Sequence, residues 1–100
     1  MTKVFTSGRW TVTPGREDEF IAAWTELAEW SRANAAGASW VVLLRDQETR
    51  NVFTSFGPWE SPAAVEAWRA SEGFRSHITR IRGLLDDFVA TTLDPVVQLR

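Results

Sequence analysis

The chain has 100 residues, of which 44% are hydrophobic and 24% charged, and its formal net charge is −2. This length predicts a single domain over residues 1–100, and the slight negative charge without a basic tract argues against nucleic-acid binding. No apolar run reaches the roughly 20 residues that span a bilayer, and the N-terminus lacks the apolar segment of a secretory signal. We therefore expect no membrane partner and a cytoplasmic location.

The missing residue types narrow the possible chemistry. Cys and Tyr are absent, and His77 is the only histidine. Disulfides, thiolate catalysis and metal motifs that need two histidines in one chain are thereby excluded. The sequence also has no Gly-x-Gly-x-x-Gly motif and no phosphate-binding Gly-Lys-Ser/Thr loop, so nicotinamide, flavin and nucleotide cofactors are not expected. We predict no metal and, in the first instance, no cofactor.

The first predicted element is a strand over Val4–Val12. Its residues alternate in character, which is typical of a strand with two different faces. The more apolar face is expected to meet the helices and carries Val4, Thr6, Gly8, Trp10 and Val12. A turn signal follows at residues 13–15.

Residues 17–34 are predicted to form a helix. Three acids, Glu17, Asp18 and Glu19, open it at the end where the helix dipole favours negative charge. Apolar residues then recur at helical spacing, with Trp24 and Leu27 on the buried face. Core packing and a pocket wall are both open as roles for Trp24.

A hairpin is predicted next. Residues 39–45 are mostly apolar and β-branched, which suggests a strand buried on both faces. Residues 46–51 form a polar loop, and residues 52–56 return as a strand that Gly57 and Pro58 end.

The second helical region is predicted over residues 61–87, in two pieces. Ser61 and Pro62 give the pattern of an N-cap followed by proline in the first turn. Ser71 and Gly73 interrupt the run, and the second piece is expected to bury Phe74, Ile78, Ile81 and Leu85. A final strand is predicted over residues 88–93.

The predicted order is β-α-β-β-α-β, an α+β ferredoxin-like fold with a four-stranded antiparallel sheet and two helices on one face, the second one broken. The other sheet face then lacks a cover, which would expose Phe5 and one side of the strand from Trp40. The apolar tail of Val96, Val97 and Leu99 also has no obvious place in the chain. We therefore predict a homodimer that pairs through the sheet face and the C-terminal tail.

Trp68 and His77 are the leading candidates for a functional site. They fall on consecutive helical pieces beside a bend, where an indole and an imidazole can line a pocket. Trp10 and Trp24 are candidates for walls of the same pocket. For each tryptophan the alternative is plain core packing, and for His77 it is a helix surface without a function.

Four segments together resemble the antibiotic biosynthesis monooxygenase (ABM) domain of the dimeric α+β barrel superfamily. They are Arg9–Glu17, Leu43–Asp46, Trp59–Pro62 and Trp68–Phe74. The resemblance covers nearly the whole chain and implies the ferredoxin-like fold. Members include cofactor-independent oxygenases that turn polyketide anthrones into quinones, haem-degrading monooxygenases, and proteins with no known reaction.

The quinone-forming branch resembles a site with Asn and Trp on this helix, a Tyr after it and an Arg. Trp68 matches the Trp, whereas Ala64 and Phe74 stand where Asn and Tyr would be. The resemblance implies that Trp68 and His77 are catalytic and that Phe74 and Arg75 or Arg82 bind an aromatic substrate. Trp10 and Trp24, the candidate pocket walls, are expected to bind the same substrate. The substrate itself would then supply the electron to oxygen.

The haem-degrading branch resembles a site with Asn on the first strand, Trp on the second helix and His as the axial haem ligand. Trp68 and His77 match the last two, but Gly8 replaces the Asn. Three functions therefore stay open: an oxidoreductase of the ABM type without cofactor, a haem-binding or haem-degrading monooxygenase that uses His77, and a non-catalytic module that binds a small aromatic ligand or dimerises.

Overall fold

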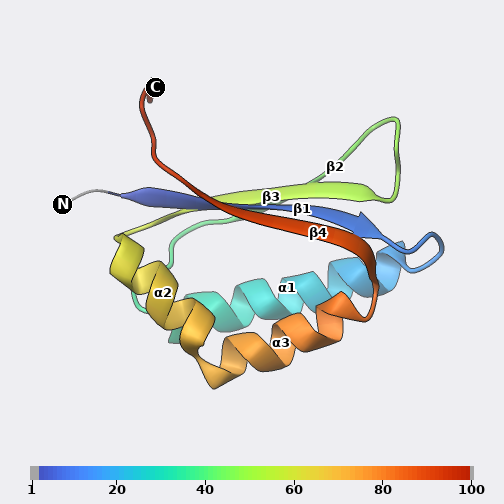
Figure 1. Ribbon diagram of the computed structural model, residues 1–100, viewed down its shortest axis with the longest axis horizontal. Coiled ribbons are helices and arrows are strands. Elements are labelled where there is room, and N and C mark those ends of the chain that lie inside the picture. Colours follow the sequence, from blue (N-terminus) through green and yellow to red (C-terminus); the bar gives the residue numbers. More distant parts are fainter. Residues whose placement is uncertain (1–2, 100) are drawn as a thin grey trace.

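A computed structural model describes residues 3–99, and its seven elements form two layers (Figure 1). One layer is an antiparallel sheet in the order β2-β3-β1-β4, made of β1 (Val4–Val12), β2 (Val42–Arg45), β3 (Val52–Trp59) and β4 (Leu85–Leu93). The other layer holds α1 (Glu17–Asn34), α2 (Pro62–Ala70) and α3 (Glu72–Arg82), all on one face of the sheet. The ferredoxin-like α+β fold with a broken second helix is confirmed. No helix within residues 3–99 is long and apolar enough to cross a membrane.

Strand β1 lies at the centre of the sheet and presents the predicted face to the helices. Its inward residues include Val4, Trp10 and Val12, which are all buried. A strand that pairs on both sides satisfies its backbone groups in the ladder, and its alternating pattern then decides which face is covered.

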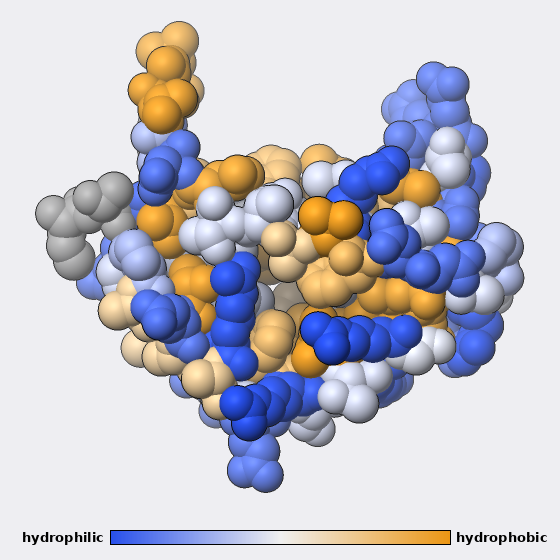
Figure 2. Space-filling view, viewed as in Figure 1, coloured by the Kyte–Doolittle hydropathy of each residue, from blue (hydrophilic) through white to orange (hydrophobic). Residues whose placement is uncertain are grey.

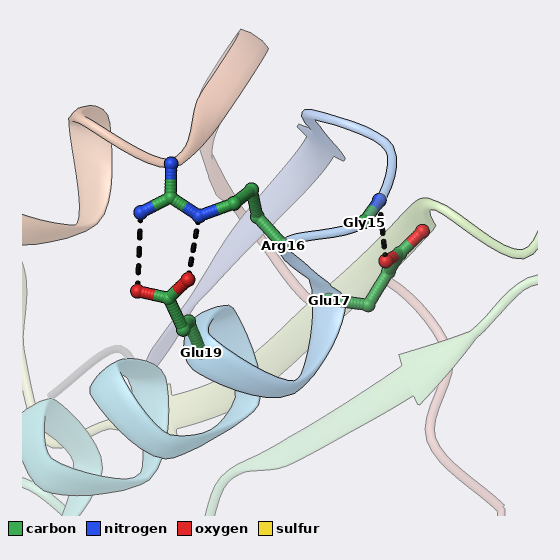
Figure 3. Close-up of polar contacts among 4 residues, drawn as sticks. All are labelled: Gly15, Arg16, Glu17 and Glu19. Atoms are coloured by element: carbon green, nitrogen blue, oxygen red, sulfur yellow. Dashed lines mark hydrogen bonds and ion pairs between the residues drawn. The ribbon is translucent and has the colours of Figure 1, made fainter.

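Helix α1 begins and ends where the sequence predicted. Figure 3 shows the polar contacts at its start. The Gly15 amide donates to Glu17 Oε1 at 2.9 Å, so a first-turn acid satisfies a free amide at the helix start. Arg16 donates to both carboxylate oxygens of Glu19. This ion pair lowers the pKa of Glu19.

Strand β2 differs from the prediction of a strand over residues 39–45 that is buried on both faces. It begins only at Val42 and is an edge strand, so Leu44 is 47% exposed. The preceding segment passes so close to β3 that the Trp40 carbonyl oxygen would lie 2.5 Å from a Cβ on Gly57. Periodicity alone does not show that this segment crosses the strand instead of pairing with it.

Strand β3 continues past the predicted end to Trp59. Pro58 stands opposite Phe5 of β1 in the ladder. The ladder with β2 has already ended at the pair Val42–Phe56, and beyond it that side of β3 has the isolated bridge Ala38–Trp59. Pro58 falls between the two, where no ladder needs its missing amide.

The break between α2 and α3 falls at Ser71. Its hydroxyl donates to the Trp68 carbonyl at 2.7 Å and accepts from the Phe74 amide at 3.2 Å, so one side chain ends α2 and caps α3. Ser61 caps α2 as predicted, accepting from the Ala64 amide at 3.2 Å. The start of α2 and the break between α2 and α3 therefore both depend on hydrogen bonds between a serine hydroxyl and the nearby backbone.

The prediction that the second helical region continues to Asp87 was wrong. Helix α3 ends at Arg82, and β4 already begins at Leu85. The Leu84 carbonyl accepts from the Thr13 amide at 2.9 Å, which ties the end of the helix to the turn after β1. Leu85 consequently belongs to the sheet and not to the buried face of α3.

The outer face of the sheet and the C-terminal tail expose apolar side chains, as expected from the uncovered sheet. Trp40 is 52% exposed and Val89 is 50% exposed. Phe5 contacts the Trp40 ring edge-on at 6.3 Å between centroids. The apolar tail projects from the globule (Figure 2), and Val96 in it is 91% exposed.

Candidate functional site

The inner face of the sheet is built from rows of paired residues whose size changes abruptly. On β4, β1 and β3 two adjacent rows hold only small side chains and are called the small rows below: Thr92–Thr6–Gly57 and Ala90–Gly8–Ser55. On β2 the second row continues to Leu43. Bulky rows lie on both sides, with Val4–Trp59 at one end and Phe88–Trp10–Phe53 at the other. The helices cannot fill the space over the small rows, because helix and sheet stay apart at a distance set by the bulky rows.

A pocket lies over the small rows, between the sheet and the three helices. About 90 Å³ of it is open to the centre of a water-sized molecule, and the space between its walls, counted out into the open mouth, is about 750 Å³. Its walls are mostly apolar and include Trp24 and Leu27 of α1, Trp68 of α2 and Phe74 of α3. The pocket separates two buried clusters, one around Phe20 and Phe53 and the other around Val4, Trp59 and Val65.

Three tryptophans of the pocket donate their indole N–H groups to protein hydroxyls. Trp10 Nε1 donates to Ser55 Oγ at 3.0 Å, Trp59 Nε1 to Thr6 Oγ1 at 3.1 Å and Trp68 Nε1 to Ser31 Oγ at 2.9 Å. Because these polar groups are paired, the rings offer a ligand their apolar surfaces.

Trp68 is held rigidly in the wall. Ser31, which receives its indole N–H, donates in turn to the Leu27 carbonyl at 2.7 Å. The Trp68 ring packs against Trp59 at 4.6 Å and Phe74 at 4.5 Å between centroids. The bend at Ser71 brings Phe74 of α3 back against Trp68 of α2, so the break in the helix shapes this aromatic wall.

Gly8 makes room for Trp10. A Cβ on Gly8 would lie 2.8 Å from Trp10 Nε1, so the indole folds back over the glycine on its way to Ser55. An Asn at this position, as in the haem-degrading branch, would displace the indole. The observed position of the Trp10 indole therefore requires a glycine at position 8.

The structure divides the predicted site residues into two groups. Trp10, Trp24, Trp68 and Phe74 all line the pocket. Trp10 is also buried in the core, so core packing and pocket wall are both true of it. His77, Arg75 and Arg82 are not among the lining residues, and the two arginines are exposed.

His77 lies on α3 against Trp30, at 5.6 Å between ring centroids. Trp30 packs on Gly73, where any Cβ would clash with its ring. These contacts place the imidazole beside a ring that does not line the pocket. The residues present therefore do not fit a haem held in this pocket by His77, and the catalytic role predicted for His77 stays a prediction.

Several polar pocket residues were not predicted as site residues. Thr6 and Ser55 lie on the pocket floor, and Arg32 and Arg69 line the wall. The sequence held a signal for the floor, because the inward face of the first strand has two small residues in succession, Thr6 and Gly8. The arginines gave no signal, since Arg69 reads as a solvated helix residue until its contact with Thr92 is seen, at 3.1 Å from Nη1 to Oγ1.

The fold and the pocket define a ferredoxin-like α+β domain with an aromatic-walled pocket. The family model for antibiotic biosynthesis monooxygenases matches residues 4–80, and the chain therefore belongs to this ABM family. No curated protein matches the chain in sequence.

Several solved structures share the fold. SnoaB from Streptomyces nogalater, described as a cofactor-independent oxygenase, is 24% identical with a TM-score of 0.90, covering 99% of this chain and 98% of SnoaB. A putative antibiotic biosynthesis monooxygenase from Caulobacter crescentus is 20% identical with a TM-score of 0.87, over 96% of this chain and 92% of the other. PA3566 from Pseudomonas aeruginosa is 22% identical with a TM-score of 0.82, over 97% of both chains. At these identities the likeness concerns the fold.

Proposed function

We propose that the chain is a cofactor-independent monooxygenase that acts on an aromatic, anthrone-like polyketide substrate in the pocket over the small rows. The observation that carries this proposal is the pocket itself, which combines four aromatic predicted residues, Trp10, Trp24, Trp68 and Phe74, in one wall system. Membership of the ABM family and the likeness to SnoaB, described as a cofactor-independent oxygenase, support the same reaction type.

The reaction needs little from the protein beyond binding and control of one proton. Loss of a proton from the CH₂ group of an anthrone gives a carbanion conjugated with the rings, which can reduce O₂ by one electron. Recombination and loss of water then convert CH₂ plus O₂ into C=O plus H₂O. The pocket would hold the rings flat between indoles and keep water away from the anion.

Oxygen uptake by the purified protein tests the proposal. With dithranol (1,8-dihydroxyanthrone) as substrate and no additive, we expect uptake faster than the spontaneous rate, with the matching quinone as product. Trp68→Phe removes the indole that packs on Phe74, so the rate is expected to fall about tenfold or more. Trp30→Phe makes the same chemical change outside the pocket and is expected to keep the rate. No protein-dependent uptake with dithranol and related hydroxylated polycyclics would leave the non-catalytic binding module as the better interpretation.

The role predicted for His77 is tested in the same assay. The imidazole lies outside the pocket wall, so the proposal for the pocket does not require it. If His77→Ala keeps the oxygen uptake, the prediction that His77 is catalytic fails. If uptake falls with an altered pH profile, His77 acts in the reaction from outside the pocket.

We also propose that two copies of the chain pair through the outer face of the sheet. Support comes from the apolar side chains gathered there, among them Trp40, Phe56, Val89 and Leu93. A second copy presents the same apolar surface and would cover it. Light scattering should give twice the chain mass for the parent protein and the single chain mass for Leu44→Glu, whereas Ser76→Glu on α3 should stay dimeric. A single chain mass for the parent above micromolar concentration would overturn this proposal.

A further inference from the structure

Two hydroxyl groups on the pocket floor have a proton that the fold does not use. Ser55 Oγ accepts from Trp10 Nε1, and Thr6 Oγ1 accepts from Trp59 Nε1. Within residues 3–99 neither hydroxyl donates a hydrogen bond to a protein acceptor. A hydroxyl has one proton to donate and can rotate it to suit a partner, so both are available to a bound molecule.

The indoles hold these hydroxyls in place and strengthen them as donors. Trp10 is fixed by its stack on Phe88, at 4.2 Å between centroids, and Trp59 by its contact with Trp68 at 4.6 Å. A hydroxyl that accepts a hydrogen bond becomes a better donor, since the two bonds polarise each other. Each floor hydroxyl is thus the end of a fixed indole–hydroxyl pair.

The sheet register places both hydroxyls under one ligand. Thr6 stands opposite Gly57 and Ser55 opposite Gly8, so the two residues are diagonal neighbours on adjacent strands. Diagonal neighbours of this kind are about 7 Å apart. The other two corners are glycines: the Trp10 indole lies against Gly8, and the Trp40–Val41 backbone approaches Gly57.

The charges around the pocket are of one sign. Arg32 and Arg69 line it, and none of the described residues that line it is an acid. A second, more open groove shares Trp24 and Arg32 with the pocket. Glu29 lines this groove but not the pocket. Donors and cations in an apolar pocket favour a ligand with acceptor oxygens, above all an anionic one.

We propose that Thr6 and Ser55 bind the oxygens of a phenolate or enolate, so that the pocket selects flat aromatic ligands with an acidic hydroxyl and holds them as anions. This inference rests on the proposed function and names the form in which the substrate binds. The ligand loses its proton to solvent water on binding, and the two hydroxyls donate to oxygens of the resulting anion. Thr6 and Ser55 would thereby favour the anion that transfers an electron to O₂.

Alizarin (1,2-dihydroxyanthraquinone) is a suitable probe, because its deprotonation changes its visible spectrum and it carries no CH₂ group to oxidise. We expect saturable binding, and a midpoint for deprotonation of the bound dye about one pH unit below that of the free dye, since hydrogen bonds to an anion are stronger than those to the neutral form. 9,10-Anthraquinone has the same ring system without an acidic hydroxyl and should bind at least tenfold more weakly.

Paired variants separate the hydroxyl from the shape of the side chain. Thr6→Val keeps the shape without the hydroxyl and should abolish about half of the shift, whereas Thr6→Ser keeps the hydroxyl and should retain it. Ser55→Ala should act like Thr6→Val, and Thr54→Val on the outer face should change nothing. Thermal unfolding of each variant without ligand shows whether it is folded at the temperature of the titration.

The outcomes separate this inference from the proposed function. A bound midpoint equal to that of the free dye, equal shifts in Thr6→Val and the parent, or no saturable binding of alizarin would each overturn the inference. Oxygen uptake with dithranol in that case would still support the monooxygenase. A shifted midpoint that depends on the hydroxyls, without oxygen uptake, would uphold the inference and overturn the monooxygenase.

Discussion

The packed and the hollow parts of the helix–sheet interface lie side by side on the same strands. In the packed part, Phe20 and Phe53 are fully buried with ring centroids 5.0 Å apart. In the hollow part, Ser55 lies two residues beyond Phe53 on β3 and pairs with Gly8 on β1. Both residues line the pocket. The strands are the same and only the side-chain volumes differ.

This difference shows how a domain of 100 residues can hold a sizeable pocket. Bulky rows on both sides of the small rows keep the helices at a fixed height, so the interface does not collapse over the small rows. The clusters on either side bury the apolar area that stabilises the fold. The pocket between them leaves some apolar surface unburied and so contributes less to stability. Substitutions should therefore act on stability in the packed rows and on binding in the small rows.

The largest effect is expected from Phe53→Ala in the packed part. Phe53 is 2% exposed, and its loss leaves a cavity against Phe20. The free energy of unfolding should fall by about 3–5 kcal/mol, as measured by urea denaturation followed by circular dichroism. Phe53→Leu, which keeps most of the volume, should lose less than half as much. Equal losses in the two variants would show that cavity volume is not the cause.

A smaller effect is expected from Gly8→Ala, at the border of the two parts. The new Cβ would lie 2.8 Å from Trp10 Nε1 and push the indole off Ser55. We expect a loss of about 1–3 kcal/mol in the free energy of unfolding, with a change in tryptophan fluorescence. Gly83→Ala is the control, because its nearest neighbour, the Arg80 carbonyl oxygen, is 3.4 Å away. Equal stability of the two variants would contradict the contact between Gly8 and Trp10.

Ala90→Leu should separate stability from binding. Ala90 pairs with Gly8 in a small row and lines the pocket, so a larger side chain fills space that a ligand would need. The free energy of unfolding should change by less than about 1 kcal/mol, while affinity for alizarin falls at least tenfold. Val89→Leu enlarges the neighbouring residue on the outer face and should leave the affinity unchanged. Undiminished affinity in Ala90→Leu would place the ligand elsewhere.

The smallest effect is expected in the hairpin loop, outside both parts. The amides of Thr49 and Glu48 donate to Asp46 Oδ1 at 2.7 and 2.8 Å and lower the pKa of this carboxyl. Because the folded-state pKa is lowered, the contribution to stability is present above the ordinary pKa of Asp and is lost as pH falls through the folded value. In Asp46→Asn the acceptor oxygen remains but cannot titrate, so Tm should fall slightly less between pH 6 and pH 3 than in the parent. A steeper fall in the variant would contradict this sign.

Local signals predicted much of the fold because their causes are local. The acids at Glu17–Glu19, the cap at Ser61 and the break at Ser71 act through bonds to backbone groups a few residues away. The course of residues 39–41 and the strand through Pro58 were not predictable in this way, because each depends on where another strand ends.

The site shows the same division. Trp10, Trp24 and Trp68 were candidates from their places on the predicted elements and Phe74 from the family resemblance, and all four line the pocket. The floor hydroxyls were missed because Thr6 and Ser55 are distant in sequence and meet only through the ladder between β1 and β3. His77 lies on the helix that follows the bend, as predicted. Its ring, however, contacts Trp30 and does not line the pocket.

By itself the sequence determined the fold class, the family, the helix boundaries that depend on capping groups, and the apolar character of both sheet faces. These properties follow from residue periodicity and from contacts along the chain. Only the tertiary structure decided that the two small rows lie next to each other, that Gly8 receives the Trp10 indole, and that the pocket hydroxyls keep their protons free. The register between distant strands sets these relations, and no short stretch of sequence encodes it.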